Sequence, residues 1–215
     1  TSKVTNMQNM FTSARAFAQD VSAWTGPAAT TAQSAIFAGA TKFQTTFQCA
    51  NSNNGPASSC YAKPFSSWIT LAEAVKQCFI ESSDGDCACK TTACGGVGLH
   101  ITKWNTSGVL YMQNLFKDRT TFNQDITKWD TRSTINMYSM FENAAAFNQN
   151  VGAWDVAQVT DLSDMFKGAT KFDYDLSKWI LPASATTTTM FEGADAFNAK
   201  FSCSTANKPS TCAPK

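Results

Sequence analysis

The stretch from Met140 to Trp154, MFENAAAFNQNVGAW, is one copy of a repeat that recurs along most of this 215-residue chain. We take its first phenylalanine, Phe141, as the anchor of the repeat, and a second phenylalanine follows six residues later. The anchors are Phe11, Phe37, Phe116, Phe141, Phe166 and Phe191, and the second rings are Phe17, Phe43, Phe122, Phe147, Phe172 and Phe197. A fixed period of about 25 residues is typical of stacked repeat proteins.

Tryptophans reinforce the period. They follow the anchor at thirteen residues in four repeats, as Trp24, Trp129, Trp154 and Trp179, and Trp104 holds the matching place ahead of Phe116. Large aromatic side chains at fixed places of a repeat are more often core than surface. We therefore predict that these phenylalanines and tryptophans form the core. The alternative is a carbohydrate platform, if the rings are exposed.

Within a repeat, Met137, Met140, Phe141 and Ala144 have the i, i+3, i+4, i+7 spacing of one helix face. The segment from Phe147 to Trp154 has more β character. We expect each repeat to contain one short helix plus one short strand. A single repeat cannot bury both of its faces, so the repeats stack and their strands form a parallel ladder. The predicted fold class is α/β, a right-handed solenoid of units of about 25 residues.

The pattern Met-x2-Met-Phe-x2-Ala-x2-Phe-Asn-Gln-Asp-Ile-x2-Trp-Asp resembles the bacterial surface protein 26-residue repeat family. That family is linked to the BspA-type leucine-rich repeats of surface proteins in bacteria, algae and protists. The resemblance covers most of the chain and is clearest from Leu115 to Thr131 and from Met165 to Trp179. It implies a leucine-rich-repeat-like solenoid, usually outside the cell, without a shared enzymatic activity. Gln33, Thr187 and Arg119 depart from the pattern and suggest edge repeats.

Two segments end alike. The sequences Phe43–Cys49 and Phe197–Cys203 share Phe-x3-Phe-x-Cys, and each is followed by a polar loop and a second cysteine. We predict two C-terminal caps, closed by the disulfides Cys49–Cys60 and Cys203–Cys212. The predicted organisation is residues 1–60 as the end of a first repeat array with its C-terminal cap, 61–100 as a helical, Cys-rich N-terminal cap of a second array, 101–200 as a four-repeat array, and 201–215 as its C-terminal cap.

A helix is predicted over residues 66–80. Apolar residues there are spaced for one helix face, namely Trp68, Leu71, Ala72, Val75 and Phe79. Its start is either Ser67, or Thr70 with Glu73 as a capping box. A polar stretch from Ser82 to Asp86 ends it. An amphipathic helix is suited to cover the open end of a repeat stack, because a terminal element needs one polar face.

Eight cysteines form an even set outside the phenylalanine and tryptophan positions. This favours disulfides, an oxidising compartment and an extracellular or cell-surface location. The four central ones are Cys78, Cys87, Cys89 and Cys94. Zinc is the alternative for them, but neither a CxxC pair nor a histidine at ligand spacing is present. A Cys87–Cys89 bond would be strained, so Cys78 should pair with one of the other three.

A polar track follows the second phenylalanine of the repeats. Its members are Gln19 and Asp20, Asn123–Asp125, Asn148–Asn150, Asp173 and Asp175, and Asn198. Carboxylates aligned on successive repeats could bind Ca²⁺. The favoured interpretation is a ladder of side chains that satisfies backbone groups at the bends. Glutamine in the middle position supports hydrogen bonding over metal binding. We therefore predict no metal site.

The bulk properties exclude several classes of function. A formal net charge of +1 without a basic run argues against a nucleic-acid partner. No stretch approaches the roughly 20 apolar residues of a membrane span. His100 is the single histidine, and neither a nucleophile motif nor a phosphate-binding loop accompanies it. We predict no enzyme and no cofactor. Asn105 heads the single N-glycosylation sequon, and Thr186–Thr189 is an O-glycosylation candidate.

The predicted function is that of an extracellular structural or adhesive repeat protein, which acts through surface contacts. The expected partners are the chain itself, as a homopolymer, or other surface proteins and glycans. The alternative is a receptor-like module that binds carbohydrate or protein on the solenoid face. A structural protein should self-associate without ligand, whereas a receptor should stay monomeric and show a pocket.

The first repeat suggests one mode of assembly. Thr1 aligns with Thr106 and Thr131, and nothing like the 66–80 helix precedes it. We expect an uncapped end there, with four apolar residues at this assembly edge: Val4, Met7, Met10 and Phe11. Exposed ends of this kind invite pairing with another chain. Either the chain was cut from a longer one, or a neighbouring copy covers the end and builds a filament or surface layer head to tail.

Overall fold

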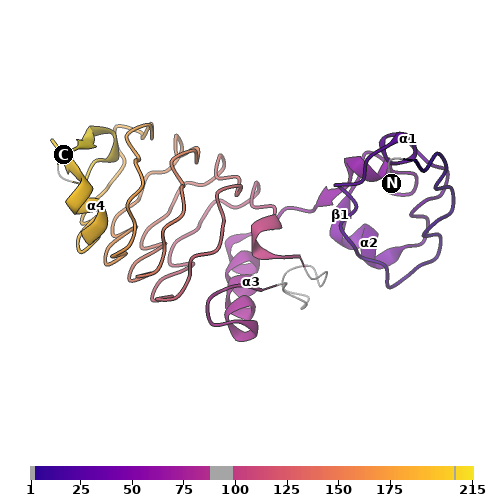
Figure 1. Ribbon diagram of the computed structural model, residues 1–215, viewed down its shortest axis with the longest axis horizontal. Helices are drawn as coiled ribbons and strands as arrows, with labels where there is room; N and C mark the ends of the chain where they lie inside the picture. Colours follow the sequence, from indigo (N-terminus) through magenta and orange to yellow (C-terminus); the bar gives the residue numbers. More distant parts are fainter. Residues whose placement is uncertain (1–2, 88–98, 206) are drawn as a thin grey trace. The chain divides into compact units, whose positions relative to one another are not determined.

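The computed structural model describes residues 3–87, 99–205 and 207–215 (Figure 1). The chain divides into two compact units. The N-terminal unit comprises Thr1–Lys63 and Lys90–Leu99, and the C-terminal unit comprises Pro64–Cys89 and His100–Lys215. Each unit contains its own repeats and its own terminating hairpin.

Regular secondary structure lies mainly at the ends of the repeats. The N-terminal unit contains α1 (Pro27–Thr30), α2 (Thr41–Thr46), β1 (Phe47–Gln48), the 3₁₀ turn η1 (Ala57–Ser59) and β2 (Tyr61–Ala62). The C-terminal unit contains α3 (Trp68–Glu81), η3 (Ile101–Lys103), α4 (Asp195–Lys200), β3 (Phe201–Cys203), η4 (Pro209–Thr211) and β4 (Cys212–Pro214). Strand β1 pairs antiparallel with β2, and β3 with β4.

The four repeats of the C-terminal unit follow one another as loops side by side between α3 and α4 (Figure 1). From residue 105 to 194, all of which are described, the expected short helix and strand take the form of consecutive turns and single-residue bridges. The bridges are parallel and join Tyr111 to Asn136, Asn136 to Asp161 and Asp161 to Thr186, at intervals of 25 residues. Successive repeats are therefore in register.

Backbone hydrogen bonds join each repeat to the next. The N–H groups of Met112, Phe116 and Asp118 donate to the carbonyls of Asn136, Met140 and Glu142. The same pattern recurs one repeat later, where Met137, Phe141 and Asn143 donate to Asp161, Met165 and Lys167. Because these N–H groups bond to another repeat, they are not available for the i to i−4 bonds of a helix.

The backbone adopts the left-handed conformation at two residues in each repeat of the C-terminal unit. They stand two residues before and two residues after the anchor, as Asn114 and Asp118, Ser139 and Asn143, Asp164 and Gly168, and Thr189 and Gly193. A right-handed helix needs negative φ throughout, so these residues end it on both sides of the anchor. The conformation costs about 1–2 kcal/mol for a residue with a side chain. The inter-repeat hydrogen bonds offset that cost.

Two columns of phenylalanine rings form the core of the C-terminal unit. In the anchor column, the ring centroids of Phe116 and Phe141 are 5.5 Å apart, and those of Phe141 and Phe166 are 5.6 Å apart. The Phe191 ring follows at 6.0 Å from Phe166. The second rings, from Phe122 to Phe197, are 6.0–6.1 Å apart. All eight of these rings are buried, as are Trp104, Trp129, Trp154 and Trp179. Rings stacked in register thus fill the interior along the direction of the repeats.

The core is less complete in the N-terminal unit. Phe37 and Phe43 are buried, whereas Phe11, Phe17 and Trp24 are only half-buried, which corrects the prediction that all three lie in the core. The Phe11 ring stacks on Phe37, and the Phe17 ring stacks on Phe43. These rings therefore meet the next repeat along one face, while the rings in the middle of the other unit are covered on both.

Helix α3 covers the first repeat of the C-terminal unit. Of the two predicted starts, Ser67 is the N-cap, and its side chain forms a capping box with Thr70. The Trp68 indole N–H donates to the Gln113 carbonyl over 3.4 Å. Phe79 packs edge-on against Phe116 and Phe122. The helix thus supplies apolar side chains and a donor to the repeat beside it.

The two C-terminal caps are built alike. Cys49–Cys60 and Cys203–Cys212 are disulfides, as the shared cysteine pattern predicts. Each bond closes an antiparallel hairpin that follows a six-residue helix, α2 or α4. A cross-link that closes a loop of this length stabilises the folded state by on the order of 2–3 kcal/mol.

Amide side chains complete both caps. Gln44 Nε2 donates to the Phe37 carbonyl, and Asn198 Nδ2 donates to the Phe191 carbonyl, each from seven residues beyond the anchor. The N–H of Phe37 donates to the Asn53 carbonyl, and the N–H of Phe191 donates to Asn207 Oδ1. The polar loop between the two cysteines therefore supplies the acceptors that a further repeat would have supplied.

A third disulfide joins Cys78 to Cys87 and ties the end of α3 to the segment after it. This bond agrees with the prediction that Cys78 pairs with one of the other three central cysteines, of which Cys89 and Cys94 lie outside the described residues. Three disulfides within one chain are typical of proteins from oxidising compartments.

Replacing Phe147 with alanine should lower the free energy of unfolding by about 3–5 kcal/mol. The ring is fully buried and lies between Phe122 and Phe172, so the substitution leaves a cavity in the middle of a column. Chemical denaturation measures the loss. Tyr138→Ala, an exposed position of the same repeat, is the matched control and should change stability little. Equal losses in both variants would contradict the core assignment.

Peptide mapping without reductant should recover Cys49–Cys60, Cys78–Cys87 and Cys203–Cys212 as three separate short-loop bridges. Each pair lies within its own hairpin or helix end, so no bridge should join one cap to the other. A peptide linking Cys49 to Cys203 would show that the caps are not independent.

Candidate functional site

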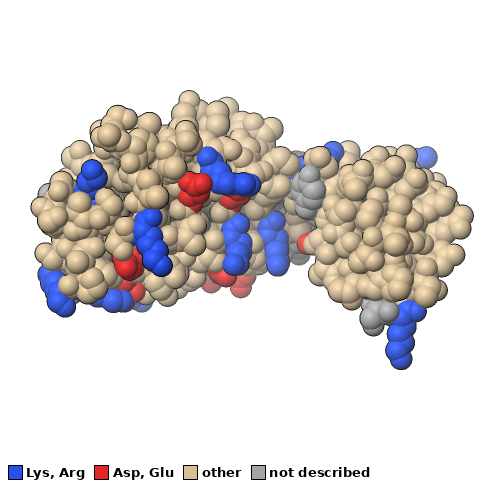
Figure 2. All heavy atoms as spheres, turned by 90° about the horizontal axis from the view of Figure 1, so that it is seen from above, with Lys and Arg blue, Asp and Glu red and all other residues tan. Residues whose placement is uncertain are grey.

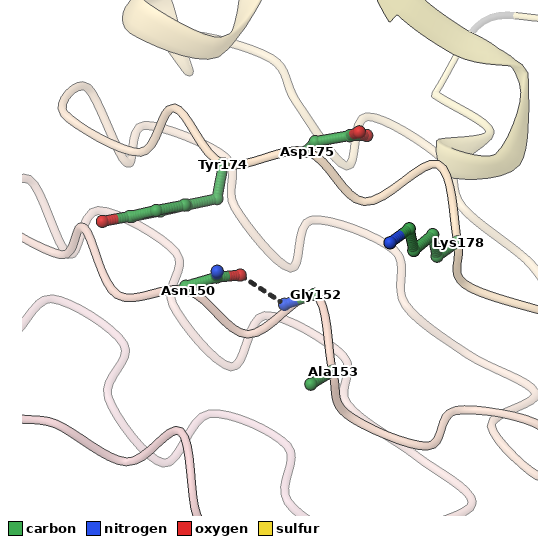
Figure 3. A pocket seen from close by; sticks show the side chains of 6 residues that line it. All are labelled: Asn150, Gly152, Ala153, Tyr174, Asp175 and Lys178. Atoms are coloured by element: carbon green, nitrogen blue, oxygen red, sulfur yellow. Dashed lines mark hydrogen bonds between the residues drawn. The ribbon is translucent and has the colours of Figure 1, made fainter.

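A shallow hollow lies on the C-terminal unit between the repeats anchored at Phe141 and Phe166 (Figure 3). Its volume is about 330 Å³. One repeat contributes Asn150, Gly152 and Ala153, and the next contributes Tyr174, Asp175 and Lys178. Both segments are the bends that follow the second phenylalanine of their repeats. Tyr174 and Lys178 lie at opposite ends of the hollow in this view.

Side-chain turns hold the two bends. Asn150 Oδ1 accepts the N–H of Gly152 over 3.2 Å, and Asp175 Oδ1 accepts the N–H of Ser177 over 2.8 Å. These bonds fix one oxygen of each side chain. Four further polar groups have no hydrogen-bond partner among the described residues: Asn150 Nδ2, Asp175 Oδ2, the Tyr174 hydroxyl and Lys178 Nζ. The hollow therefore offers donors, an acceptor and one aromatic ring to a ligand.

Departures from the repeat pattern open the hollow. Twenty-five residues earlier than Gly152, Ala153 and Tyr174, the chain has Thr127, Lys128 and Gln149. A Cβ atom at Gly152 would lie 2.8 Å from the Asp175 carbonyl oxygen, so the two bends approach as closely as they do because residue 152 is a glycine. This site is absent from the sequence-based predictions. The feature of the sequence that could have revealed the site is the replacement of two bulky side chains of the preceding repeat by Gly152 and Ala153, beside the new Tyr174.

A second exposed surface runs along the parallel bridges, which we call the bridge face. Its bridge residues are Tyr111, Asn136, Asp161 and Thr186. Tyr111 is 44% exposed, and Tyr138 is 37% exposed two residues beyond the next bridge position. Asp161 Oδ1 accepts the Thr186 hydroxyl and the N–H of Ser163. The face combines polar side chains with two accessible tyrosine rings.

The residue that follows each anchor is alternately positive and negative from one repeat to the next. This charge ladder consists of Lys117, Glu142, Lys167 and Glu192. Lys117 Nζ lies 2.7 Å from Glu142 Oε2, and Lys167 Nζ lies 3.6 Å from Glu192 Oε1. Figure 2 shows side chains of both signs close together on the C-terminal unit. An alternating ladder favours neighbouring repeats in their observed order.

The pairing of Lys117 with Glu142 shifts both pKa values. Burial raises the pKa of the Glu142 carboxyl, but the Lys117 ammonium at 2.7 Å, the nearby Ser139 hydroxyl and the positive charge of Lys167 outweigh it. The net pKa of Glu142 lies below its ordinary value. The same pairing raises the pKa of Lys117. Both shifts favour the ionised pair.

The polar track bonds to the backbone of the neighbouring repeat. Asn123 Oδ1 accepts the N–H of Asn148, and Asn148 Oδ1 accepts the N–H of Asp173. Lys200 Nζ donates to the Asp173 carbonyl and carboxylate at the end of the track. Within the described residues, no three His, Cys, Asp or Glu side chains form a group that could hold a metal ion. These bonds favour the ladder interpretation of the track.

The remaining candidates have local partners. Asn105 is half-buried, and its Oδ1 accepts both the N–H and the hydroxyl of Ser107. His100 Nε2 lies 2.7 Å from Asp86 Oδ1, and its Nδ1 accepts the N–H of Thr102 at the start of η3. His100 therefore serves as a local cap in this structure.

The assembly edge is only partly exposed. Val4 and Met10 are 36% and 47% exposed and Phe11 is half-buried, but Met7 is only 2% exposed. Its placement on the edge is wrong. Met7 stands at the position of Met112 and Met137, which point into the core of their own repeats, and its N–H donates to Gln33 Oε1.

In the described part of the chain, no helix has the length and apolar character needed to cross a membrane. Among known families, the model of one described as "Mycoplasma protein of unknown function, DUF285" matches residues 1–70 and 90–204. No curated protein and no solved structure matches the chain.

Glu142→Gln should make the C-terminal unit less sensitive to acid. Because the folded pKa of Glu142 is depressed, its contribution to stability is present above the ordinary glutamate pKa and is lost as the pH falls through the folded value. The contribution of such a partly exposed pair is at most about 1 kcal/mol. Thermal melts at neutral pH and at about pH 3 measure the difference.

The variant should melt at a lower temperature than the native chain at neutral pH, and the gap should narrow in acid. Glu192→Gln is the control, because Glu192 occupies the same ladder at 3.6 Å from its lysine and is more exposed. A gap that is independent of pH would show that Glu142 contributes through packing alone.

Proposed function

The chain belongs to the DUF285 family of Mycoplasma proteins of unknown function, and from that premise we propose that it is an extracellular structural or adhesive repeat protein. In this proposal it acts through contacts on its surface and carries out no catalysis. Three disulfides support an oxidising, extracellular setting at or near a cell surface.

The proposal includes the fold. We interpret the stacked repeats as a leucine-rich-repeat-like solenoid, of the kind that the resemblance to the bacterial surface protein repeats implies. Parallel bridges at intervals of 25 residues and two continuous columns of rings support this interpretation. Helix α3 and the two disulfide-closed hairpins serve as its end caps.

The observation that carries the proposal is the difference between the buried and the exposed positions of each repeat. In the C-terminal unit, the anchor rings, second rings and tryptophans are buried and nearly identical from repeat to repeat, so they build the scaffold. The repeats differ mainly in exposed side chains, which include Leu110, Tyr111, Tyr138 and Ile180. Conserving the interior while varying the exterior suits a protein whose activity is surface contact. Its expected partners are other surface proteins and glycans, or further copies of the chain.

Two forms of this function differ in their partner. Exposed Val4 and Met10 favour association between copies, although the burial of Met7 reduces the apolar edge available for it. Exposed tyrosines on the bridge face favour the second form, a receptor-like module that binds protein or carbohydrate there. We place the structural or adhesive form first and the receptor-like form second.

Sedimentation velocity over a wide range of concentrations separates the two forms. The structural form predicts concentration-dependent association, which the double variant Val4→Ser and Met10→Ser should weaken. Ile69→Ser, at an equally apolar and more exposed position of α3, is the control. A chain that stays monomeric favours the receptor-like form.

Beads coated with the chain test adhesion directly. They should bind surfaces carrying extracellular proteins or polysaccharides more strongly than beads coated with a variant in which Leu110, Tyr111 and Tyr138 are all serine. If the chain stays monomeric and its beads bind none of these surfaces, both forms of the proposal are contradicted.

A further inference from the structure

We propose that the hollow between the repeats of Phe141 and Phe166 binds a sugar ring of a neutral polysaccharide. The inference deepens the proposed function, because it names a class of glycan partner and a site for it. It rests on the surface-contact proposal but does not depend on self-association. All six lining residues supply the argument: Asn150, Gly152, Ala153, Tyr174, Asp175 and Lys178.

Tyr174 provides the platform. The residue is half-buried, and its ring packs against Phe172 with centroids 6.4 Å apart and an angle of 54° between the planes. Phe172 is itself buried in the second column of rings, so the tyrosine is supported from below. An aromatic face carries partial negative charge, and the C–H groups on one side of a pyranose ring carry partial positive charge. A sugar can therefore lie against a ring that is already held in place.

The polar groups match the hydroxyls of a sugar. A hydroxyl both donates and accepts, so it can bond to the amide nitrogen of Asn150, the free oxygen of Asp175 and the ammonium of Lys178. One negative and one positive side chain give the hollow no net charge. Asp175 would repel an acidic ligand, and Lys178 would repel a basic one. A neutral ligand can form hydrogen bonds to both side chains. A few placed polar groups beside an apolar surface are typical of ligand sites.

The shape favours part of a chain over an enclosed small molecule. The volume of about 330 Å³ lies at the lower end of the range for ligand sites, and the hollow is open on its outer side. An open hollow between two bends leaves room for a polymer to continue in both directions. Because the hollow is only partly enclosed, single-site binding should be weak.

The repeats provide an internal comparison. Gln124 and Gln149 stand at the position of Tyr174, and Lys128 and Lys178 stand at the position of Ala153. Exchanging Tyr174 for glutamine, or Ala153 for lysine, therefore installs a residue that the same fold already accepts one repeat away. The first change removes the platform and the second fills the hollow. Both leave the buried columns intact.

Four neutral tetrasaccharides serve as probes: cellotetraose, laminaritetraose, chitotetraose and mannotetraose. Saturation-transfer NMR with the full 215-residue chain detects weak binding, and calorimetric titration measures it. We expect at least one probe to bind, with Tyr174→Gln and Ala153→Lys each weakening it by about tenfold or more. Tyr174→Phe should retain affinity to within about threefold, because it keeps the ring. Tyr138→Gln should have no effect. Melting temperatures verify that every variant is folded.

Three results would overturn the inference. They are no binding to any of the four probes, binding that Tyr174→Gln and Ala153→Lys both leave intact, and binding that Tyr138→Gln abolishes, which would move the site to the bridge face. A chain that adheres to protein-coated surfaces but binds no saccharide overturns the inference and leaves the proposed function standing. Loss of both adhesion and saccharide binding counts against the two together.

Discussion

The structure depends on the bonding of each repeat's backbone to the next at a constant offset. Phe116 donates to Met140 and Phe141 to Met165, and these bonds set the rings of the anchor column 5.5–6.0 Å apart. A slip by one residue would break the bonds and turn the rings away from each other at the same time. Because one register satisfies both requirements, the hydrogen bonds and the apolar core stabilise each other.

A stack of repeats has two ends, and the ends explain the irregular parts of the chain. The first repeat of the C-terminal unit meets α3, and the last meets a hairpin closed by Cys203–Cys212. These segments are short and cannot bury much apolar surface by themselves, so a cross-link that restricts the unfolded chain contributes more to them than to a repeat. Asn207 and its counterpart Asn53 supply acceptors to a terminal repeat. The same solution occurs in both units.

The stacked rings keep the interior nearly constant, with only conservative changes such as Ile126, Val151 and Leu176, while larger changes among repeats lie on the outside. The charge ladder, the bridge face and the hollow beside Tyr174 all arise at positions where the backbone is constant and the side chain is free to change. Such positions recur at intervals of 25 residues, and neighbouring repeats therefore place chosen side chains side by side. This arrangement suits recognition of extended partners, and it lets a few substitutions create a site without disturbing the core.

The sequence by itself determined the period, the ring columns, the two caps with their disulfides and the helix that begins beyond Ser67, because each depends on apolar spacing or paired cysteines within a short segment. The tertiary structure decided the rest. The helical spacing of apolar residues around Phe141 also fits a series of turns. Serine rarely adopts a left-handed backbone, so the sequence does not predict the positive φ of Ser139. Those turns exist because the N–H groups bond to another repeat. The hollow beside Tyr174 likewise forms from two bends that are distant in sequence and adjacent only after stacking.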